Sequence, residues 1–303
     1  MEHLRIITKN HTNPAYGGAL VGARAVAQRM GCTLDHFAPH DADSPEEQSA
    51  MIDQAIADRP DAIVLLPAHA TGVNAAIARV NAAGIPLILF VSEPTEGRCV
   101  GFIGSDDIRM AASLAHAVLP QLPPHAKVAI IDGHPGSITT PQRRRGFEQA
   151  LAQYPGMQLV DVVPGYYQHA PGREAALALL SRHARLDAIL AANDLMAMGA
   201  LEALAETGRS VPMVSINGTP DAIAAVRAGA LVATASFNTH RFGCLAVEMA
   251  LRHLRGERVP RRLDLAPDII DATNAPEWDV PYEERPCPQW DHVVASQAEP
   301  VAA

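Results

Sequence analysis

Two segments of the chain repeat one another, and this repeat restricts the fold more than any other feature. RPDAIVLLPAHATGVNAAIARVNAAGIPLILF begins at Arg59, and RLDAILAANDLMAMGALEALAETGRSVPMVSI begins at Arg185. Each segment opens with Arg-x-Asp-Ala-Ile, continues through an apolar run and an alanine-rich run, and enters a second apolar run after a glycine and a proline. A repeated strand–helix–strand unit predicts two similar α/β domains rather than one long sheet.

Apolar runs alternate with alanine-rich stretches at helical spacing along most of the chain, which predicts doubly wound parallel sheets with crossover helices. The expected strands are residues 4–8, 33–37, 62–66, 87–91, 127–132, 158–163, 188–192 and 213–216. Ligands of such sheets bind beyond the carboxyl ends of the strands. Two facing domains would therefore place two sets of polar strand ends across a cleft.

The strand expected at 188–192 ends abruptly at Asn193-Asp194. Both side chains suit a helix cap, and a strand end also suits a ligand contact. We expect Asn193 to present polar atoms to a ligand and Asp194 to cap the helix that follows.

The composition argues against nucleic acid and against a membrane span. The formal net charge is −9, and the arginine runs, at 143–145 and 261–262, are short. Because a phosphate backbone requires a basic surface, no nucleic-acid partner is expected. No apolar run approaches the ~20 residues that a spanning helix needs.

No pattern in the sequence demands catalysis, a cofactor or a bound metal, so we expect no enzyme. Gly17–Gly22 lacks the Gly-Lys-Ser/Thr ending of a phosphate loop, and we interpret its glycines as helix-packing positions. His134 lies near Ser137, but without the G-x-S-x-G turn that exposes a nucleophile. Four cysteines occur without a CxxC pair and are expected to be isolated thiols, namely Cys32, Cys99, Cys244 and Cys287.

Five short motifs in order carry a resemblance to a known family. They are TNPAY from Thr12, GSDD from Gly104, RRRGF from Arg143, AANDLMAMGAL from Ala191 and NGTPD from Asn217. With them the chain resembles the type I periplasmic binding proteins, in the ribose-binding-protein-like group that also includes the effector domains of LacI-type repressors. The resemblance covers about residues 4 to 273.

The resemblance implies a domain organisation with three crossovers that form a hinge. One domain would be residues 1–106 with 239–265, and the other 107–238 with 266–273. Closure about the hinge would bury the ligand in the cleft. Residues 274–303 lie beyond this pattern and are rich in proline. They are expected to form a loosely ordered tail, or to dock on the body through Trp278 or Trp290.

The resemblance also implies a set of ligand-binding positions. Four positions depart from the family pattern: Val91-Ser92 replaces Asp-Arg, Asn217 replaces Asp, and Phe237 replaces Gln. The expected ligand-binding residues are Lys9, Asn13, Tyr16, Val91, Ser92, Arg143, Tyr167, Asn193, Asn217 and Phe237.

The charge of the ligand stays open at this point. Two carboxylates of the family pattern are missing, while Lys9 and Arg143 remain, which favours an acidic ligand because Arg pairs well with a carboxylate. If acidic residues of this chain neutralise the two cations, a neutral ligand follows instead. The candidates for that role are Asp106, Asp107, Asp194 and Asp221.

The function implied by the resemblance is that of a solute-binding protein of an ABC importer. It would bind a sugar, polyol or sugar acid without chemistry, act as a monomer, and dock transiently on a membrane permease. A periplasmic location is implied by the resemblance alone, because the N-terminus MEHLRIITKN has no leader pattern. The alternative is the ligand-sensing domain of a LacI-type regulator without its DNA-binding part.

Overall fold

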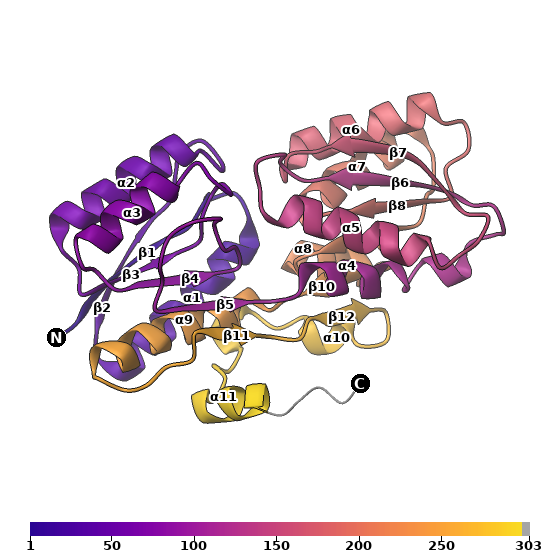
Figure 1. Ribbon diagram of the computed structural model, residues 1–303. Coiled ribbons are helices and arrows are strands. Elements are labelled where there is room, and N and C mark those ends of the chain that lie inside the picture. Colours follow the sequence, from indigo (N-terminus) through magenta and orange to yellow (C-terminus); the bar gives the residue numbers. More distant parts are fainter. Residues whose placement is uncertain (299–303) are drawn as a thin grey trace. The chain divides into compact units, whose positions relative to one another are not determined.

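Two six-stranded sheets run through the protein, one in each of two units (Figure 1). The structure is a computed structural model and describes residues 1–298. Unit 1 comprises Met1–Ser105, Thr239–Leu265 and the chain from Pro281 onward, and unit 2 comprises Asp106–Asn238 and Ala266–Val280. The sheets have the orders β11-β5-β4-β3-β1-β2 and β12-β10-β9-β8-β6-β7, so strands of the same rank take the same places. This shared order is the structural form of the sequence repeat.

The elements alternate between strand and helix, as a doubly wound α/β fold requires. Unit 1 contains β1 (His3–Ile7), α1 (Pro14–Met30), β2 (Thr33–Phe37), α2 (Pro45–Asp58), β3 (Ala62–Leu65), α3 (Asn74–Ala82), β4 (Leu87–Phe90), β5 (Gly101–Gly104), α9 (Thr239–Leu254), β11 (Arg262–Asp264), the 3-10 helix η2 (Tyr282–Glu284) and α11 (Trp290–Ala298). Unit 2 contains α4 (Asp107–Ala115), η1 (Leu119–Gln121), β6 (Lys127–Asp132), α5 (Thr139–Leu151), β7 (Gln158–Pro164), α6 (His169–Arg182), β8 (Ala188–Ala191), α7 (Asp194–Thr207), β9 (Met213–Ile216), α8 (Pro220–Arg227), β10 (Ala233–Ser236), β12 (Asp268–Asp271) and α10 (Ala275–Trp278). The strand pairs are parallel except for β12, which runs antiparallel to β10.

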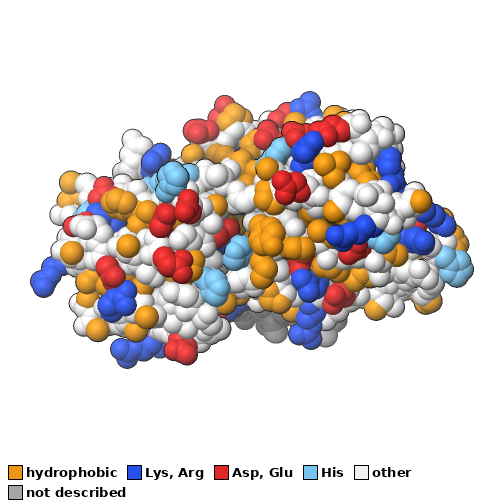
Figure 2. Space-filling model, turned by 90° about the horizontal axis from the view of Figure 1, so that it is seen from above, with side chains coloured by type: hydrophobic (Ala, Val, Ile, Leu, Met, Phe, Trp, Pro, Cys, Tyr) orange, Lys and Arg blue, Asp and Glu red, His pale blue; other side chains and the backbone are white. Residues whose placement is uncertain are grey.

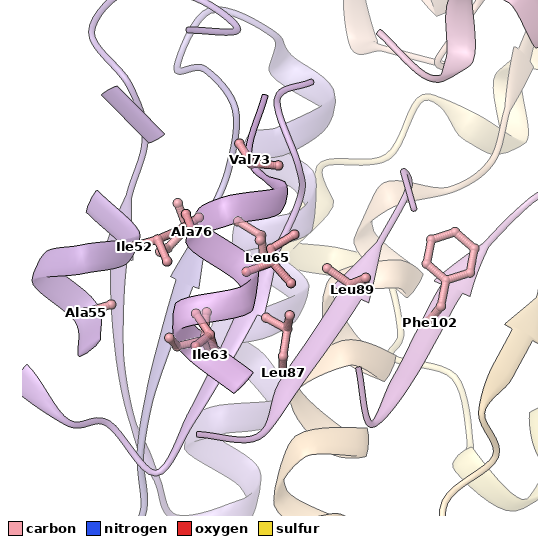
Figure 3. Packing of buried hydrophobic residues seen from close by; sticks show 12 residues of the cluster. Ile52, Ala55, Ile63, Leu65, Val73, Ala76, Leu87, Leu89 and Phe102 are labelled. Atoms are coloured by element: carbon pink, nitrogen blue, oxygen red, sulfur yellow. The ribbon is translucent and has the colours of Figure 1, made fainter. Parts of the chain in front are cut away.

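The sheet of unit 1 is covered by helices on both faces. Helices α2 and α3 pack on one face, and α1 and α9 on the other. On the α2–α3 face, fully buried side chains of the strands, such as Ile63 and Leu65, meet Ile52 of α2 and Ala76 of α3 (Figure 3). Continuous apolar strands of this kind stabilise a parallel sheet because both of their faces are removed from water.

Helices α1 and α9 approach closely because glycines lie at their contact. A Cβ atom on Gly22 would lie 2.2 Å from the carbonyl oxygen of His240, and one on Gly243 would lie 1.9 Å from that of Ala19. Either side chain would push the helices apart. The interpretation of the glycines at 17–22 as helix-packing positions is confirmed at Gly22.

A buried carboxylate holds together the carboxyl ends of three strands in unit 2. Asp194, the first residue of α7, is fully buried and accepts hydrogen bonds from the hydroxyls of Ser215, Thr234 (2.8 Å) and Thr219 (3.0 Å), and from the Thr219 amide (2.8 Å). Burial raises the pKa of the Asp194 carboxyl, while these hydrogen bonds oppose that shift. The network ties the start of α7 to β9, to the loop after β9 and to β10.

The helix cap is the neighbouring residue, not Asp194 as the sequence suggested. The side-chain oxygen of Asn193 accepts from the Met196 amide at 2.9 Å, and Asn193 has the extended backbone of an N-cap. Asp194 lies one residue inside the helix, where a carboxylate is also favourable beside the helix N-terminus.

The C-terminal segment is ordered through residue 298 and does not form a separate tail. Residues 274–280 group with unit 2, and the chain from Pro281 groups with unit 1. Trp290 is 6 % exposed and lies 5.2 Å under the guanidinium of Arg252, measured to the ring centroid. Of the two sequence expectations, docking of Trp290 is therefore the one that the structure shows; residues 299–303 lie outside the described part.

A disulfide fastens this segment to unit 1. Cys244 of α9 is bonded to Cys287, whereas Cys32 and Cys99 are free thiols. The expectation of four isolated thiols is therefore wrong for Cys244 and Cys287. Because these two residues are 43 positions apart, spacing along the sequence gave no sign of the pair.

Breaking this disulfide should lower the stability of the protein. The bond closes a loop between residues 43 positions apart. In the chain-entropy description, this lowers the entropy of the unfolded chain and raises its free energy by about 4 kcal/mol. We expect Cys287→Ser, or reduction of the native protein, to lower the urea midpoint accordingly, and Cys99→Ser, which removes a free thiol, to leave it nearly unchanged. Equal midpoints for Cys287→Ser and the native protein would contradict the structural role of the disulfide.

Replacing Asp194 by asparagine should also destabilise the fold. Asparagine presents an NH2 group to donors that now meet a carboxylate oxygen, which leaves at least one buried group unsatisfied, at a cost of about 2 kcal/mol. Urea unfolding of Asp194→Asn measures this loss. Asp221→Asn, at an exposed position in the first turn of α8, is the control and should change stability by less than about 0.5 kcal/mol. If both variants unfold alike, the Asp194 network is not important for stability.

Candidate ligand-binding site

The ten expected ligand-binding residues follow the carboxyl ends of parallel strands, either in the loop there or in the first two turns of the next helix. They divide into a unit 1 set, after β1 and β4, and a unit 2 set, after β6, β7, β8, β9 and β10. This is the edge at which doubly wound sheets bind ligands. The unit 1 set is Lys9, Asn13, Tyr16, Val91 and Ser92, and the unit 2 set is Arg143, Tyr167, Asn193, Asn217 and Phe237.

Lys9 is buried and paired with an acidic residue that the sequence reading missed. Its Nζ lies 4.0 Å from Oδ1 of Asp43, and both side chains are almost fully buried. Asp43 also accepts from the Asn10 side chain at 2.9 Å, and its own amide donates to the Lys9 carbonyl at 2.8 Å. The positive charge after β1 is thus matched by a negative charge from the loop after β2.

Asn13 and Tyr16 are fixed by the start of α1. The Asn13 side-chain oxygen caps α1 by accepting from the Ala15 amide at 3.0 Å, and the Asn13 amide donates to the side chain of Asn10 at 3.0 Å. Tyr16 lies in the first turn of α1 and is 7 % exposed. Asn10 therefore connects the Asn13 cap to the Lys9–Asp43 pair and makes the first loop rigid.

Val91 and Ser92 form a tight turn instead of extending β4. The Ser92 amide donates to the Phe90 carbonyl at 2.8 Å across Val91, whose φ is +64°. A γ-turn with positive φ is rare, and a β-branched residue at positive φ is strained. The strand expected at 87–91 therefore ends at Phe90. Strained residues of this kind persist where the surrounding structure holds them, often at ligand sites.

The turn leaves the Ser92 hydroxyl buried without a hydrogen-bond partner. Ser92 is 2 % exposed, and its Oγ makes no hydrogen bond within the described residues. Buried polar atoms in native proteins almost always have a partner, so an exception requires an explanation. A ligand hydroxyl would supply the missing partner.

Arg143 of α5 is the centre of the unit 2 set. Its Nε donates to Asp107 at 2.6 Å and its Nη1 donates to the Ala192 carbonyl at 2.7 Å. The guanidinium carbon lies 5.7 Å from the ring centroids of both Tyr167 and Phe237, within the range of cation–π attraction. Among the acidic residues proposed from the sequence as neutralising groups, Asp107 is thus the partner of Arg143.

Tyr167 is held in position by polar and steric contacts. Its hydroxyl lies 2.9 Å from Oγ1 of Thr139 and 3.2 Å from Oγ1 of Thr140. A Cβ atom on Gly133 would lie 2.1 Å from the Tyr167 ring, so only glycine leaves room for it. The φ of Tyr167 is +61°, so Tyr167, like Val91, is an expected site residue with a left-handed backbone.

Asn193 and Asn217 complete the unit 2 set in different ways. Asn193 is 1 % exposed. Its side-chain oxygen caps α7, and its side-chain nitrogen donates to the Tyr167 carbonyl at 3.1 Å. Its main role in the structure is therefore to join α7 to the Tyr167 loop. Asn217 is 4 % exposed and has a φ of +145°, with its amide donating to the Ala235 carbonyl at 2.8 Å.

Residues that were not expected from the sequence contact the expected ones and hold them in position. All of them follow the end of a strand, a position that could have marked them as candidates in the sequence: Asn10, Asp43, Thr139 and Thr140. Nothing in the sequence, however, indicated which strand-end loop would fold back onto Lys9 or onto the Tyr167 hydroxyl. Asp107 was foreseen as one of four candidate partners for the cations.

The candidate nucleophile and base each make a hydrogen bond to another group. His134 Nδ1 accepts from the Gly136 amide at 3.1 Å, and Ser137 Oγ lies 3.1 Å from Oγ1 of Thr139. Within residues 1–298 two groups bring three possible metal ligands together, namely His240 with Cys244 and Cys287, and His40 with Asp41 and Glu47. The sulfurs of the first group are bonded to each other, and the second group is largely exposed.

The surface shows no concentration of one charge on the face seen in Figure 2, where acidic and basic side chains are interspersed among the described residues. No helix of the described residues is long and apolar enough to cross a lipid bilayer. The charged groups that matter for the site are the buried pairs described above.

Comparison with known proteins finds a matching family and related proteins of the same kind. Residues 5–258 match the family described as "Periplasmic binding protein domain". The ribose import binding protein of Escherichia coli (strain K12) is 28% identical over 257 residues, which cover 84% of this chain and 86% of that protein.

Two solved structures share the fold. An ABC transporter solute-binding protein from Mycobacterium smegmatis with bound glycerol has a TM-score of 0.85 and 28% identity, covering 91% of this chain and 96% of that one. A periplasmic solute-binding protein from Actinobacillus succinogenes with bound D-allose has a TM-score of 0.86 and 23% identity, covering 91% and 100%. With paired six-stranded α/β units and a family match over most of its length, this chain belongs to the periplasmic binding protein domain family.

Proposed function

We propose that the ligand of this protein is a neutral sugar or polyol, bound through the unit 1 and unit 2 sets. As a family member the chain is a solute-binding protein of an ABC import system and not an enzyme. The observation that carries the proposal is that the cation of each set already has a buried carboxylate partner. Lys9 pairs with Asp43, and Arg143 pairs with Asp107.

These pairs change the expectation for the ligand charge. A ligand carboxylate would have to compete with Asp107 for the Arg143 guanidinium, whose Nε and Nη1 are both engaged. Burying a charge without its own partner is costly. A neutral hydroxyl, in contrast, can accept from an engaged cation and donate to an engaged carboxylate without adding charge. The paired cations therefore favour a neutral ligand.

The rest of the two sets suits a polyhydroxylated molecule. Ser92 offers a hydroxyl that lacks a partner, and Asn217 offers an amide with both donor and acceptor atoms. Tyr16, Tyr167 and Phe237 offer aromatic surface for the apolar faces of a sugar. The relatives agree in ligand type, since one is named for ribose import and a solved one holds glycerol.

The cellular setting follows the family. We infer a periplasmic protein that acts as a monomer and delivers its ligand to a membrane permease by transient docking. The Cys244–Cys287 disulfide supports export, because disulfides persist mainly in oxidising compartments.

Neutral sugars and polyols should stabilise the protein, and their acids should not. At ~100 times the dissociation constant, a ligand adds about 2.7 kcal/mol to the free energy of unfolding. A thermal-shift screen followed by calorimetry with matched pairs, each sugar against its aldonic or uronic acid, measures the preference. We expect each acid to bind at least about tenfold more weakly, which corresponds to ~1.4 kcal/mol. NMR should recover the bound ligand chemically unchanged.

The matched control removes the neutralising carboxylate. In Asp107→Asn the Arg143 charge loses its partner, so the preference should shift toward the acids relative to the native protein. Acids that bind the native protein as tightly as the neutral sugars would overturn the neutral-ligand proposal. A ligand converted to product would overturn the binding role itself.

Ser92→Ala should weaken ligand binding without weakening the fold. The hydroxyl makes no hydrogen bond within the described protein, so its removal leaves no new unsatisfied group. A hydrogen bond to the ligand contributes about 0.5–1.5 kcal/mol, so the dissociation constant should rise by roughly 2- to 12-fold. Ser296→Ala, in α11 of the C-terminal segment, is the control for both measurements. An unchanged dissociation constant for Ser92→Ala would remove Ser92 from the site.

A further inference from the structure

The chain passes between the two units four times, one more than the three crossovers expected from the sequence. The first three passages follow Ser105, Asn238 and Leu265, and the fourth follows Val280. The fourth exists because the C-terminal segment is divided between the units instead of ending with unit 2.

On the unit 2 side the segment is anchored up to Asp279. Strand β12 pairs with β10, and α10 packs against α8 and β12 with Ala275 fully buried. Directly after α10, Asp279 forms an ion pair with Arg227 of α8. Both of these charged side chains are about half exposed, so this pair is a weak anchor by itself.

On the unit 1 side the segment is anchored from Tyr282 onward. The Tyr282 ring lies against α1, where a Cβ atom on Gly18 would be 2.6 Å from it. The Cys287–Cys244 disulfide then bonds the segment covalently to α9. Further along, Trp290 is buried, and the Gln297 side chain bonds both the amide and the carbonyl of Asp264, at 3.1 and 3.0 Å.

Only three peptide units separate the two anchors. A chain from Asp279 to Tyr282 spans at most ~11 Å when fully extended. Any movement of one unit relative to the other must keep these two residues within that distance, or one anchor must detach. The disulfide sets the longest reach of this connection, because it fixes Cys287 to α9. Even if Tyr282 detaches, only eight peptide units, at most ~29 Å when fully extended, join Asp279 to Cys287.

We propose that residues 279–287 form a strap, a fourth connection between the units that the Cys244–Cys287 disulfide locks in place. With the disulfide intact, the strap limits how far the units separate in the ligand-free protein. With the disulfide reduced, the unit 1 anchor depends on non-covalent contacts, and the range of opening increases. The effect on ligand release rests on the proposed function, whereas the effect on opening does not.

The chemistry of the lock follows from the exposure of its two sulfurs. Cys244 is fully buried and Cys287 is partly exposed, so the thiolate of an external dithiol attacks Cys287 Sγ. The S–S bond breaks, Cys244 leaves as a thiolate and takes up a proton, and a mixed disulfide forms on Cys287. The second thiol of the reductant then closes its own disulfide and releases the Cys287 thiol. Two electrons pass from the dithiol to the protein.

The test measures the separation of the units in the ligand-free full-length protein. Spin labels on non-natural amino acids replace Ala57 of α2 and Ala205 of α7, which are exposed positions in unit 1 and unit 2. Distance distributions are recorded for the oxidised protein, the protein reduced by a dithiol, Cys287→Ser, and a variant with six Gly/Ser residues inserted between Val280 and Pro281. The insertion lengthens the strap but keeps the disulfide.

The expected result is a broader distribution that extends to longer distances in the reduced protein, in Cys287→Ser and in the insertion variant. Cys99→Ser, which removes a free thiol of unit 1, should match the native protein when oxidised. Distributions for the reduced protein and the insertion variant that superimpose on that of the oxidised protein would overturn the proposal. If Cys287→Ser does not fold, these two samples still decide the outcome.

A second measurement connects the strap to ligand exchange. With a ligand found by thermal shift, the dissociation rate measured by stopped flow should rise severalfold in the insertion variant. An unchanged rate together with wider opening would restrict the strap to the ligand-free state and overturn its link to release. Absence of any ligand would count against the proposed function but would leave the distance measurements valid.

Discussion

Parallel strand pairing is the constraint on which the rest of this structure depends. Because neighbouring strands run in the same direction, their carboxyl ends meet at one edge of each sheet, and the polar loops that follow them are collected there. Lys9, Val91 and Ser92 reach that edge in unit 1, as do Arg143, Tyr167 and Asn193 in unit 2. The helices pack on the faces and leave the edge to the loops. The position of the proposed site would thus result from topology, and only its chemistry from individual side chains.

Within that edge, buried charge is compensated locally. Each cation has a carboxylate from a neighbouring element, as in Lys9–Asp43 and Arg143–Asp107, and the buried Asp194 is satisfied by hydroxyl and amide donors. The arrangement avoids the cost of isolated buried charge. It also fixes the loops before any ligand arrives, because each charged pair joins segments far apart in sequence.

The sequence was sufficient for the architecture, while the position of the ligand-binding site stays a prediction. The repeat around Asp61 and Asp187 predicted two α/β domains, and the eight expected strands correspond to observed ones. Strands β5, β10, β11 and β12 were not predicted, because each has only three or four residues and contains glycine, small or charged residues that interrupt an apolar run. The disulfide and the partner of Lys9 could not be predicted, since each depends on tertiary contact between segments with no local pattern. The helix cap was expected of Asp194 and is made by Asn193, which shows the limit of a propensity argument, because both residues favour a helix start.

The discontinuity of unit 1 has a consequence for how the protein is made. Helix α9, strand β11 and Cys287 are synthesised after all of the first stretch of unit 2, yet they complete the sheet and the helical layer of unit 1. Until α9 emerges, the apolar surface of β3, β4 and β5 that it covers stays open to water or to a chaperone. Unit 2, whose main part is continuous, is able to fold first. Formation of the Cys244–Cys287 disulfide, which passes two electrons from the two thiols to an external oxidant, must then come near the end of biogenesis, once nearly the whole chain has been made.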